Sequence, residues 1–121
     1  MGDRAVIGFK AHAEAVPVFL YSHWSGGSRY SDAQKAIEAA RSRWDDSAYA
    51  TRIAISQIVG DDWAGELGFG ISAGHNSFCQ PDYDEVILIT WGSQTVNLVS
   101  AVDSEDVVAT LSFESFCSLL V

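Results

Sequence analysis

The sequence predicts an α+β domain in which a helix pair and a C-terminal helix pack on a mostly antiparallel sheet of about five strands. Strand-like runs cluster near both ends of the chain, and two helical segments follow one another directly between them. Clustered strands beside contiguous helices are typical of α+β architecture. A length of 121 residues with 48% hydrophobic residues fits one domain, residues 1–121, with a single core.

The first third of the chain predicts a β-hairpin. Residues 4–10 (RAVIGFK) and 16–21 (VPVFLY) are rich in strand-forming residues, and Pro17 fits the start or the edge of a strand because it has no N–H to donate. The pattern breaks at HWSGGS, where Gly26 and Gly27 permit positive φ or close approach to another group. Polar and aromatic side chains are therefore expected where the second strand ends.

Two helices are expected next. Ser31 and Gln34 match a capping box at the start of the first helix, and Asp32 lies in its first turn, where the helix dipole favours negative charge. Asp45 or Asp46 would cap the second helix, and Gly60 would end it. The apolar faces expected from helical spacing comprise Ala33, Ala36, Ile37, Ala40 and Trp44 in the first helix, and Tyr49, Ala50, Ile53, Ala54 and Ile58 in the second.

The rest of the chain predicts more sheet and a last helix. Residues 67–72 are expected to form a glycine-broken strand, in which Gly68 and Gly70 suggest a bulge or a close contact with another backbone, and residues 73–85 a long polar loop. Residues 86–91 and 94–100 flank Gly92 and Ser93, which predicts a two-residue type II′ hairpin. Residues 102–111 would add a short strand. Ser112 would then cap a helix that buries Phe113, Phe116, Cys117 and Leu120.

Composition narrows the class of protein. No apolar run reaches the roughly 18 residues of a membrane helix, and the N-terminal sequence lacks the features of a signal peptide, so we expect a cytosolic protein. Cys79 and Cys117 lie far apart and have no CxxC partner, which favours two structural thiols over a disulfide or a nucleophile.

The charge is acidic and unevenly distributed. The net charge of −9 disfavours direct nucleic-acid binding. All seven basic residues lie within the first 52 positions, whereas residues 53–121 contain ten acids and no lysine or arginine. An anionic ligand could therefore be held only by the N-terminal half. The acidic half could repel or imitate nucleic acid, or serve solubility alone.

Two segments could form a binding site for a small anionic ligand. Tyr21, His23 and Trp24 offer aromatic faces for stacking a base, and Ser25, Gly26 and Gly27 offer backbone amides. The RWDD segment and the following helix add Arg43, Trp44 and Arg52, whose guanidinium groups could bind phosphate. A purely structural alternative explains the same residues: Tyr21 and Trp44 as core aromatics, and Arg43 and Arg52 paired with Asp45 and Asp46.

Catalytic and metal-binding patterns are missing from the sequence. The three histidines and the aspartates show no recurring metal-ligand spacing, and DYDE lacks the glycine and final glutamate of an EF-hand loop. There is no G-x-S-x-G elbow around Ser25, and LGFGIS is neither a Walker loop nor a dinucleotide fingerprint. We therefore predict no metal, cofactor or catalytic residue, and favour binding over catalysis.

The runs FLYSHWSG, RWDDSAYATRI and GFGIS resemble, in this order and spacing, a group of short proteins of unknown function from tailed phages and actinobacterial prophages. The pattern of that group is approximately YLYSHW-G, then RWDD-Y--R, then G-GIS, and it covers residues 16–72. The resemblance implies a phage origin. The group has no reaction that could be assigned to residues of this chain, but a phage origin favours a host-takeover or anti-defence protein that acts in the cytosol of the host cell.

Composition, site and resemblance together lead to three functional hypotheses. The first is sequestration of a small anionic nucleotide signal at the HWSGG and RWDD segments, with a homo-oligomer interface as one setting for the site. The second is an acidic inhibitor of a host protein, or a nucleic-acid mimic. The third is a hydrolase that degrades the same nucleotide. No membrane partner is expected.

Overall fold

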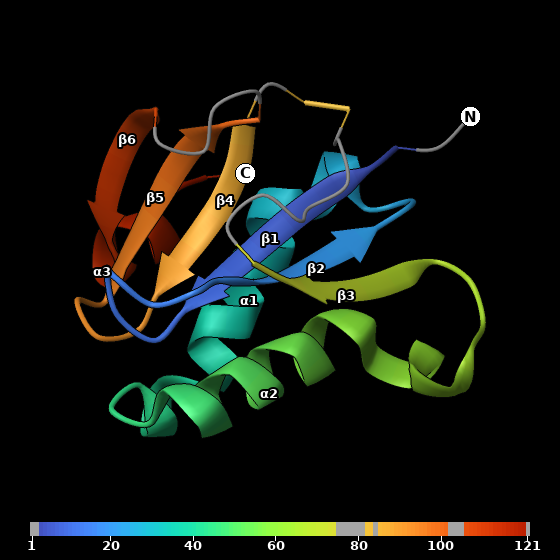
Figure 1. Ribbon diagram of the computed structural model, residues 1–121, viewed down its shortest axis with the longest axis horizontal. Coiled ribbons are helices and arrows are strands. Elements are labelled where there is room, and N and C mark those ends of the chain that lie inside the picture. Colours follow the sequence, from blue (N-terminus) through green and yellow to red (C-terminus); the bar gives the residue numbers. More distant parts are fainter. Residues whose placement is uncertain (1–2, 75–81, 84, 102–105, 121) are drawn as a thin grey trace.

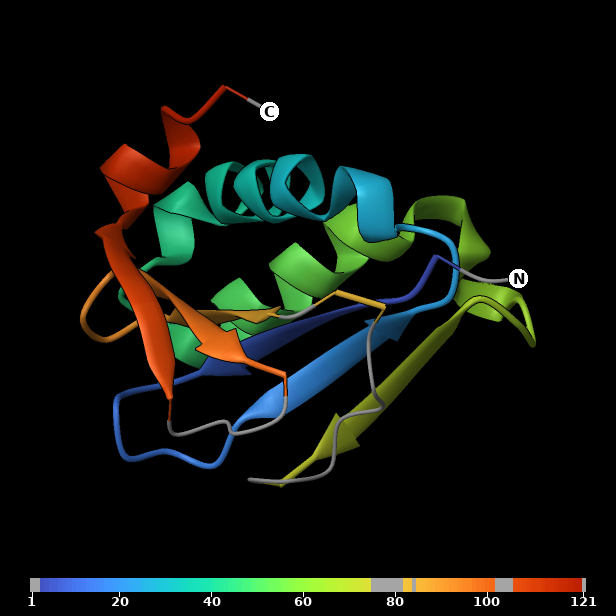
Figure 2. The ribbon, with the colours of Figure 1, turned by 90° about the horizontal axis from the view of Figure 1, so that it is seen from above.

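The computed structural model describes residues 3–74, 82–83, 85–101 and 106–120, and it has the α+β architecture expected from the sequence (Figure 1). The six strands are β1 (Ala5–Lys10), β2 (Val18–Ser22), β3 (Phe69–Ala73), β4 (Glu85–Thr90), β5 (Thr95–Ser100) and β6 (Val107–Ser112). The helices are α1 (Arg29–Ala39), α2 (Ser47–Val59) and α3 (Phe113–Cys117). Figure 2 shows all three helices on one face of the sheet.

The sheet is mixed, with strand order β3-β2-β1-β4-β5-β6. Every neighbouring pair is antiparallel except β1 and β4, which run parallel with Ile7 opposite Ile87. Both expected hairpins are present, and the short strand expected at residues 102–111 is β6, so the sheet has six strands rather than about five. Strands β3 and β6 form its two edges.

The larger core lies between the sheet and the helices. Trp91 is its largest fully buried side chain, with Phe113 at 5.5 Å and Phe9 at 6.3 Å between ring centroids. The two long helices meet through small residues that allow their backbones to approach closely, namely Ala33, Ala36, Ala40, Ala50 and Ala54. A second cluster covers the opposite face, formed by Val6, Phe19, Val86, Val99 and Ala101.

The start of α1 differs from the prediction. The helix begins at Arg29, and its N-cap, Ser28, makes no side-chain cap bond. The Gln34 amide donates instead to the carbonyls of Phe116 and Leu119 at 2.9 and 3.0 Å. The Ser31 capping box was therefore wrong, because a tertiary bond to the C-terminal segment uses the glutamine that the box required.

The β4–β5 turn also differs. The strands pair up to Thr90 and Thr95, which leaves four residues in the turn, and the Gln94 N–H bonds the Trp91 carbonyl at 3.1 Å. The positive φ belongs to Gln94, not to Gly92. The two-residue type II′ prediction was wrong because the chain reverses one residue earlier: the Trp91 carbonyl accepts the bond that closes the turn, and the Trp91 N–H donates to the Lys10 carbonyl at the end of β1.

Two predicted core residues lie at the surface. Tyr49 is 53% exposed, and α2 instead buries Ala50, Ala54, Ile55 and Val59. Leu120 is fully exposed because α3 ends at Cys117. The Ser112 cap of α3 is confirmed: its hydroxyl accepts from the Ser115 N–H at 3.1 Å. Within the described residues, no helix combines the length and apolarity needed to cross a membrane.

The α2 cap provides a test of the fold. Asp46 lies at the N-cap of α2 and accepts from the Tyr49 N–H, whereas the neighbouring Asp45 is exposed and makes no cap bond. Asp46→Ala should lower the free energy of unfolding by about 1 kcal/mol. Asp45→Ala should change it by less than about 0.5 kcal/mol. Urea unfolding with an unchanged m-value measures both, and equal effects of the two substitutions would contradict the assignment.

Candidate functional site

The exit of β2 carries an aromatic cluster formed by Tyr21, His23 and Trp24, here called the strand-exit cluster. Tyr21 and His23 are two residues apart, so they share a face, and the Tyr21 hydroxyl bonds His23 Nδ1 at 2.9 Å. The Trp24 ring meets the His23 ring edge to face, with centroids 5.1 Å apart. Trp24 is 62% exposed, whereas Tyr21 and His23 are half-buried. The cluster therefore presents one open aromatic surface.

Trp24 is held over the residue that precedes β3. The His23 N–H donates to the Gly68 carbonyl at 2.9 Å, and Gly68 has a φ of +102°. A Cβ at this position would lie 2.8 Å from Trp24 Cζ3. Glycine is thus required both by the backbone conformation and by the ring above it. Gly68 thus has a close neighbour, but the neighbour is an indole side chain and not the second backbone that the glycine-broken segment predicted.

The glycine amides after the cluster already bind a carboxylate of the chain. The Gly27 N–H donates to Asp3 Oδ2 at 2.8 Å, and the Gly26 N–H donates to the Asp3 carbonyl at 2.7 Å. The Tyr83 hydroxyl completes the arrangement by donating to Asp3 Oδ1 at 2.7 Å. The Ser25 carbonyl accepts from the Ser28 N–H at 3.2 Å, which closes the short turn into α1. The amides predicted to receive a phosphate therefore hold Asp3.

The cation nearest these amides is Arg29, which is also engaged. Its guanidinium lies 3.8 Å above the Tyr83 ring centroid, and its Nη1 donates to the Gly26 carbonyl at 2.9 Å. Its Nη2 lies 3.7 Å from Glu85 Oε1, which also accepts from the Tyr30 hydroxyl. With its side chain only 17% exposed, Arg29 serves mainly to join the start of α1 to β4.

The structure does not bring the RWDD segment to the strand-exit cluster. HWSGG precedes α1 and RWDD follows it, so the 11-residue helix separates them by about 16 Å (Figure 1). Trp44 packs on the core: its indole N–H donates to the Ile37 carbonyl at 2.9 Å, and its ring meets Phe113 at 4.9 Å. A single site that uses both segments of one chain is therefore not formed.

The two arginines of this region do not form the expected ion-pair network. The Arg43 guanidinium lies 4.7 Å above the Tyr49 ring centroid, and Arg52 is exposed on α2. Among the described residues, no ion pair joins either arginine to Asp45 or Asp46. Asp46 acts as a helix cap instead, which explains part of the RWDD pattern structurally.

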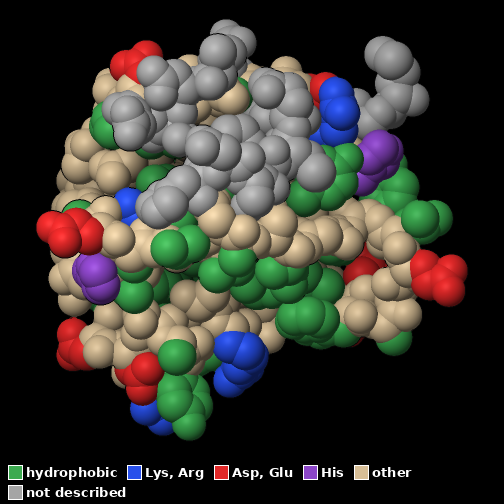
Figure 3. All heavy atoms as spheres, in the orientation of Figure 1, with side chains coloured by type: hydrophobic (Ala, Val, Ile, Leu, Met, Phe, Trp, Pro, Cys, Tyr) green, Lys and Arg blue, Asp and Glu red, His purple; other side chains and the backbone are tan. Residues whose placement is uncertain are grey.

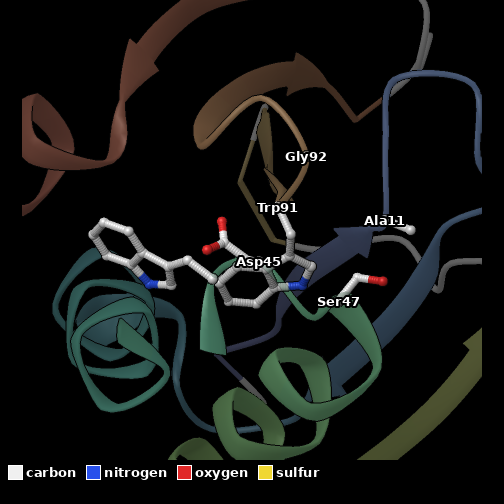
Figure 4. A pocket seen from close by; sticks show the side chains of 6 residues that line it. Ala11, Asp45, Ser47, Trp91 and Gly92 are labelled. Carbon is white, nitrogen blue, oxygen red and sulfur yellow. The ribbon is translucent and has the colours of Figure 1, made fainter. Parts of the chain in front are cut away.

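A hollow of about 210 Å³ lies beside RWDD, at the carboxyl ends of β1 and β4 (Figure 4). Its lining comprises Ala11, Trp44, Asp45, Ser47, Trp91 and Gly92. The only charged group in this lining is a carboxylate, so the hollow does not suit a phosphate. Of its two tryptophans, Trp91 is 1% exposed, and Trp44 is half-buried against the core.

A second hollow, of about 200 Å³, lies between the end of α2 and β3, and sequence reasoning missed it. Its apolar lining comprises Leu20, Val59, Trp63, Leu67, Phe69 and Ile71, and we call it the edge groove. Trp63, Leu67 and Ile71 are 53%, 79% and 55% exposed. The tryptophan and leucine within the otherwise polar stretch DDWAGEL were the sequence signal that could have revealed it. Figure 3 shows hydrophobic side chains gathered over β2 and β3.

The edge groove has an acidic rim. Asp62 contributes to its lining, and Asp61 and Glu66 are exposed on the same connection between α2 and β3. Asp61 and Asp62 lie in the first turn of the short 3₁₀ helix η3 (Gly60–Ala64), directly after α2. Among the described residues that line the groove, there is no lysine or arginine.

Catalytic chemistry has little support in the geometry. Burial raises the pKa of the Cys117 thiol to about 11, so little thiolate exists near neutral pH, and Cys79 lies outside the described residues. The Arg4 guanidinium lowers the pKa of the Asp82 carboxyl, and Arg41 lowers that of Glu38; both acids are ion-paired at the surface. In the described part of the chain, no three His, Cys, Asp or Glu side chains converge on a metal site.

The chain matches no protein-family model, no curated protein and no solved structure.

The bond between Asp3 and Tyr83 makes a testable prediction. Ionisation of Tyr83 would place a phenolate beside the Asp3 carboxylate, so this bond raises the pKa of Tyr83 above its ordinary value. Stability from the bond is present at neutral pH and is lost as the pH rises through the raised pKa. Asp3→Asn should move one of the four tyrosines back toward the ordinary pKa in a titration followed by tyrosinate absorbance. Asp32→Asn, at the same end of α1, should leave the titration unchanged.

Proposed function

We propose that this protein acts by binding another protein at the edge groove, as an acidic inhibitor of a host protein. The observation that carries the proposal is the exposure of three large apolar side chains, Trp63, Leu67 and Ile71, around one hollow at the edge of the sheet. Single exposed apolar residues are common on protein surfaces, but a gathered set around a concave surface is typical of an interaction site.

The charge around the groove indicates the chemistry of the partner. Asp62 lines the groove, Asp61 and Glu66 are exposed on the same connection, and the net charge of the chain is −9, so a basic surface would be attracted and oriented as it approaches. The resemblance to phage and prophage proteins supports a partner in the host cell, and the host cytosol is then the site of action. An acidic protein that covers a basic host surface would compete with the anionic partners of that surface.

Sequestration of a small anionic nucleotide remains a prediction, and the geometry supports it less well. The Gly26 and Gly27 amides bind Asp3, Arg43 lies beyond the other end of α1, and Arg52 is exposed on α2. A ligand at the strand-exit cluster would have to displace Asp3 or bind without a free cation. Hydrolysis of a nucleotide is weaker still: among the described residues of the cluster, the hydroxyl bonded to an imidazole is that of the half-buried Tyr21, and the nearby Ser22 hydroxyl is buried with no hydrogen-bond partner.

Capture from a host lysate tests the proposal. Wild type, Leu67→Asp and Leu120→Asp would each be immobilised, and the retained proteins would be identified by mass spectrometry. Both leucines are exposed, at 79% and 101%, so neither substitution should disturb folding, and only Leu67 lines the groove. We expect a partner retained by wild type and Leu120→Asp, and reduced at least about tenfold by Leu67→Asp. Equal retention by all three proteins would reject the groove.

The same preparations can decide between protein binding and sequestration. Small molecules released by heat from wild type and from Trp24→Ala would be compared by mass spectrometry. A nucleotide released intact by wild type alone would place the function at the strand-exit cluster and overturn our proposal.

A further inference from the structure

The outer edge of β3 suggests how the partner binds. We infer that the partner adds an extended strand to β3, and that this strand alternates apolar residues and is flanked by lysine or arginine. The inference rests on the proposed function, since it specifies the binding mode at the edge groove. It follows from the backbone of β3, from the side chains on its two faces, and from charge.

The register of β3 shows which backbone groups face outward. The His23 N–H donates to the Gly68 carbonyl, and the Gly74 N–H donates to the Pro17 carbonyl. Because bonded and non-bonded pairs alternate in an antiparallel ladder, the residues between them that bond β2 are Gly70 and Ser72. The N–H and C=O groups of Phe69, Ile71 and Ala73 therefore point away from β2. Among the described residues, no strand pairs with this side of β3.

The helix-side face of β3 can receive alternate side chains of an added strand. Ile71 pairs with Leu20, a residue of the main core, so both side chains lie on the face that the helices cover. Ile71 is nevertheless 55% exposed, and with Trp63 and Leu67 it borders the edge groove. An apolar side chain of an added strand would therefore enter the groove and shield these three residues.

The opposite face offers a second, smaller contact. The Trp24 ring lies over Gly68, the residue before β3, and it is 62% exposed, so a residue from the other set of side chains of an added strand could pack on it. In complexes formed by strand addition, main-chain hydrogen bonds give affinity, and pockets for alternate side chains give specificity.

The two edges of the sheet differ in how they are protected. Edge strands commonly carry charges, proline or bulges that prevent further pairing. The β3 sequence, FGISA, has no charge and no proline, and its pairing with β2 is regular over all five residues. The β6 edge also lacks charge, but its pairing with β5 is interrupted between Leu98 and Val99. The flat, unprotected edge is thus the one that borders the groove.

Charge favours a basic partner strand over a second copy of this chain. Asp61, Asp62 and Glu66 lie beside the entrance of β3, and two copies would each bring a net charge of −9 to the interface. Lysines or arginines at the ends of an added strand would instead meet these acids. The same charges therefore oppose self-pairing and select a basic segment.

A synthetic peptide of alternating valine and threonine, with two lysines at each end, provides the probe. Binding to the full-length protein would be measured by titration calorimetry, with backbone NMR shifts to locate the peptide. Two variants at one position separate side chain from backbone. Ile71→Ala removes apolar contact and keeps the outward N–H, and should weaken binding by about fivefold. Ile71→Pro also removes the N–H, and should weaken it by at least about tenfold more.

Proline at position 71 leaves the β2–β3 bonds intact, because the Ile71 N–H points away from β2. A peptide with one N-methylated central valine applies the same test to the unchanged protein and should bind about tenfold more weakly, so the inference is testable even if Ile71→Pro does not fold. A peptide with glutamates in place of the lysines should not bind.

Three results would overturn the inference. The first is that Ile71→Ala and Ile71→Pro weaken peptide binding equally and that N-methylation of the peptide does not change its affinity. The second is that the glutamate peptide binds as tightly as the lysine peptide. The third is concentration-dependent dimerisation of wild type that Ile71→Pro abolishes, which would make a second copy the occupant. If Leu67→Asp prevents partner capture while the peptide does not bind β3, the proposed function stands and only strand addition fails.

Discussion

The parallel pairing of β1 with β4 is the constraint on which the rest of the structure depends. These two strands are adjacent at the centre of the sheet, with Ile7 opposite Ile87 and Phe9 opposite Ile89. Parallel neighbours cannot be joined by a tight turn, so the chain between them must cross over one face. That crossover contains both long helices, which explains why they share one face and why β2 and β3 extend the sheet on the side away from β4.

The same pairing separates the two halves of the site expected from the sequence. The amino end of β1 is tied to the approach to β4 by the Arg4–Asp82 ion pair at 2.9 Å and by the Asp3–Tyr83 bond, and the strand-exit cluster lies at this end. RWDD lies at the other end, where its hollow includes residues that follow β1 and β4. Because α1 runs from one end to the other, its length sets the distance between HWSGG and RWDD.

Features that depend on neighbouring residues, such as helix caps, were predictable from the sequence, whereas contacts between distant segments were not. The cap at Ser112 was predicted, and that of α2 was narrowed to Asp45 or Asp46, because a cap depends on a few neighbouring residues. Gln34 was misassigned because its amide bonds the distant C-terminal segment, and Trp91 because its backbone N–H bonds Lys10 at the end of β1; no local pattern reveals either partner. The edge groove was missed for the same reason: it exists because β3 is the outermost strand, and that position depends on pairing between residues about fifty positions apart, such as Leu20 and Ile71.

An unprotected apolar edge strand carries a risk of self-association, and the acidity of the chain offers a physical reason why this edge can persist. A regular strand without charge or proline would pair readily with a copy of itself. A net charge of −9, with three acids beside the groove, raises the free energy of bringing two copies together. The repulsion acts only between like charges, so it leaves a basic strand free to approach. The acidic C-terminal half and the unpaired edge of β3 would then act jointly. The backbone groups of β3 would bind any extended strand, and the negative charge would exclude acidic strands and favour basic ones.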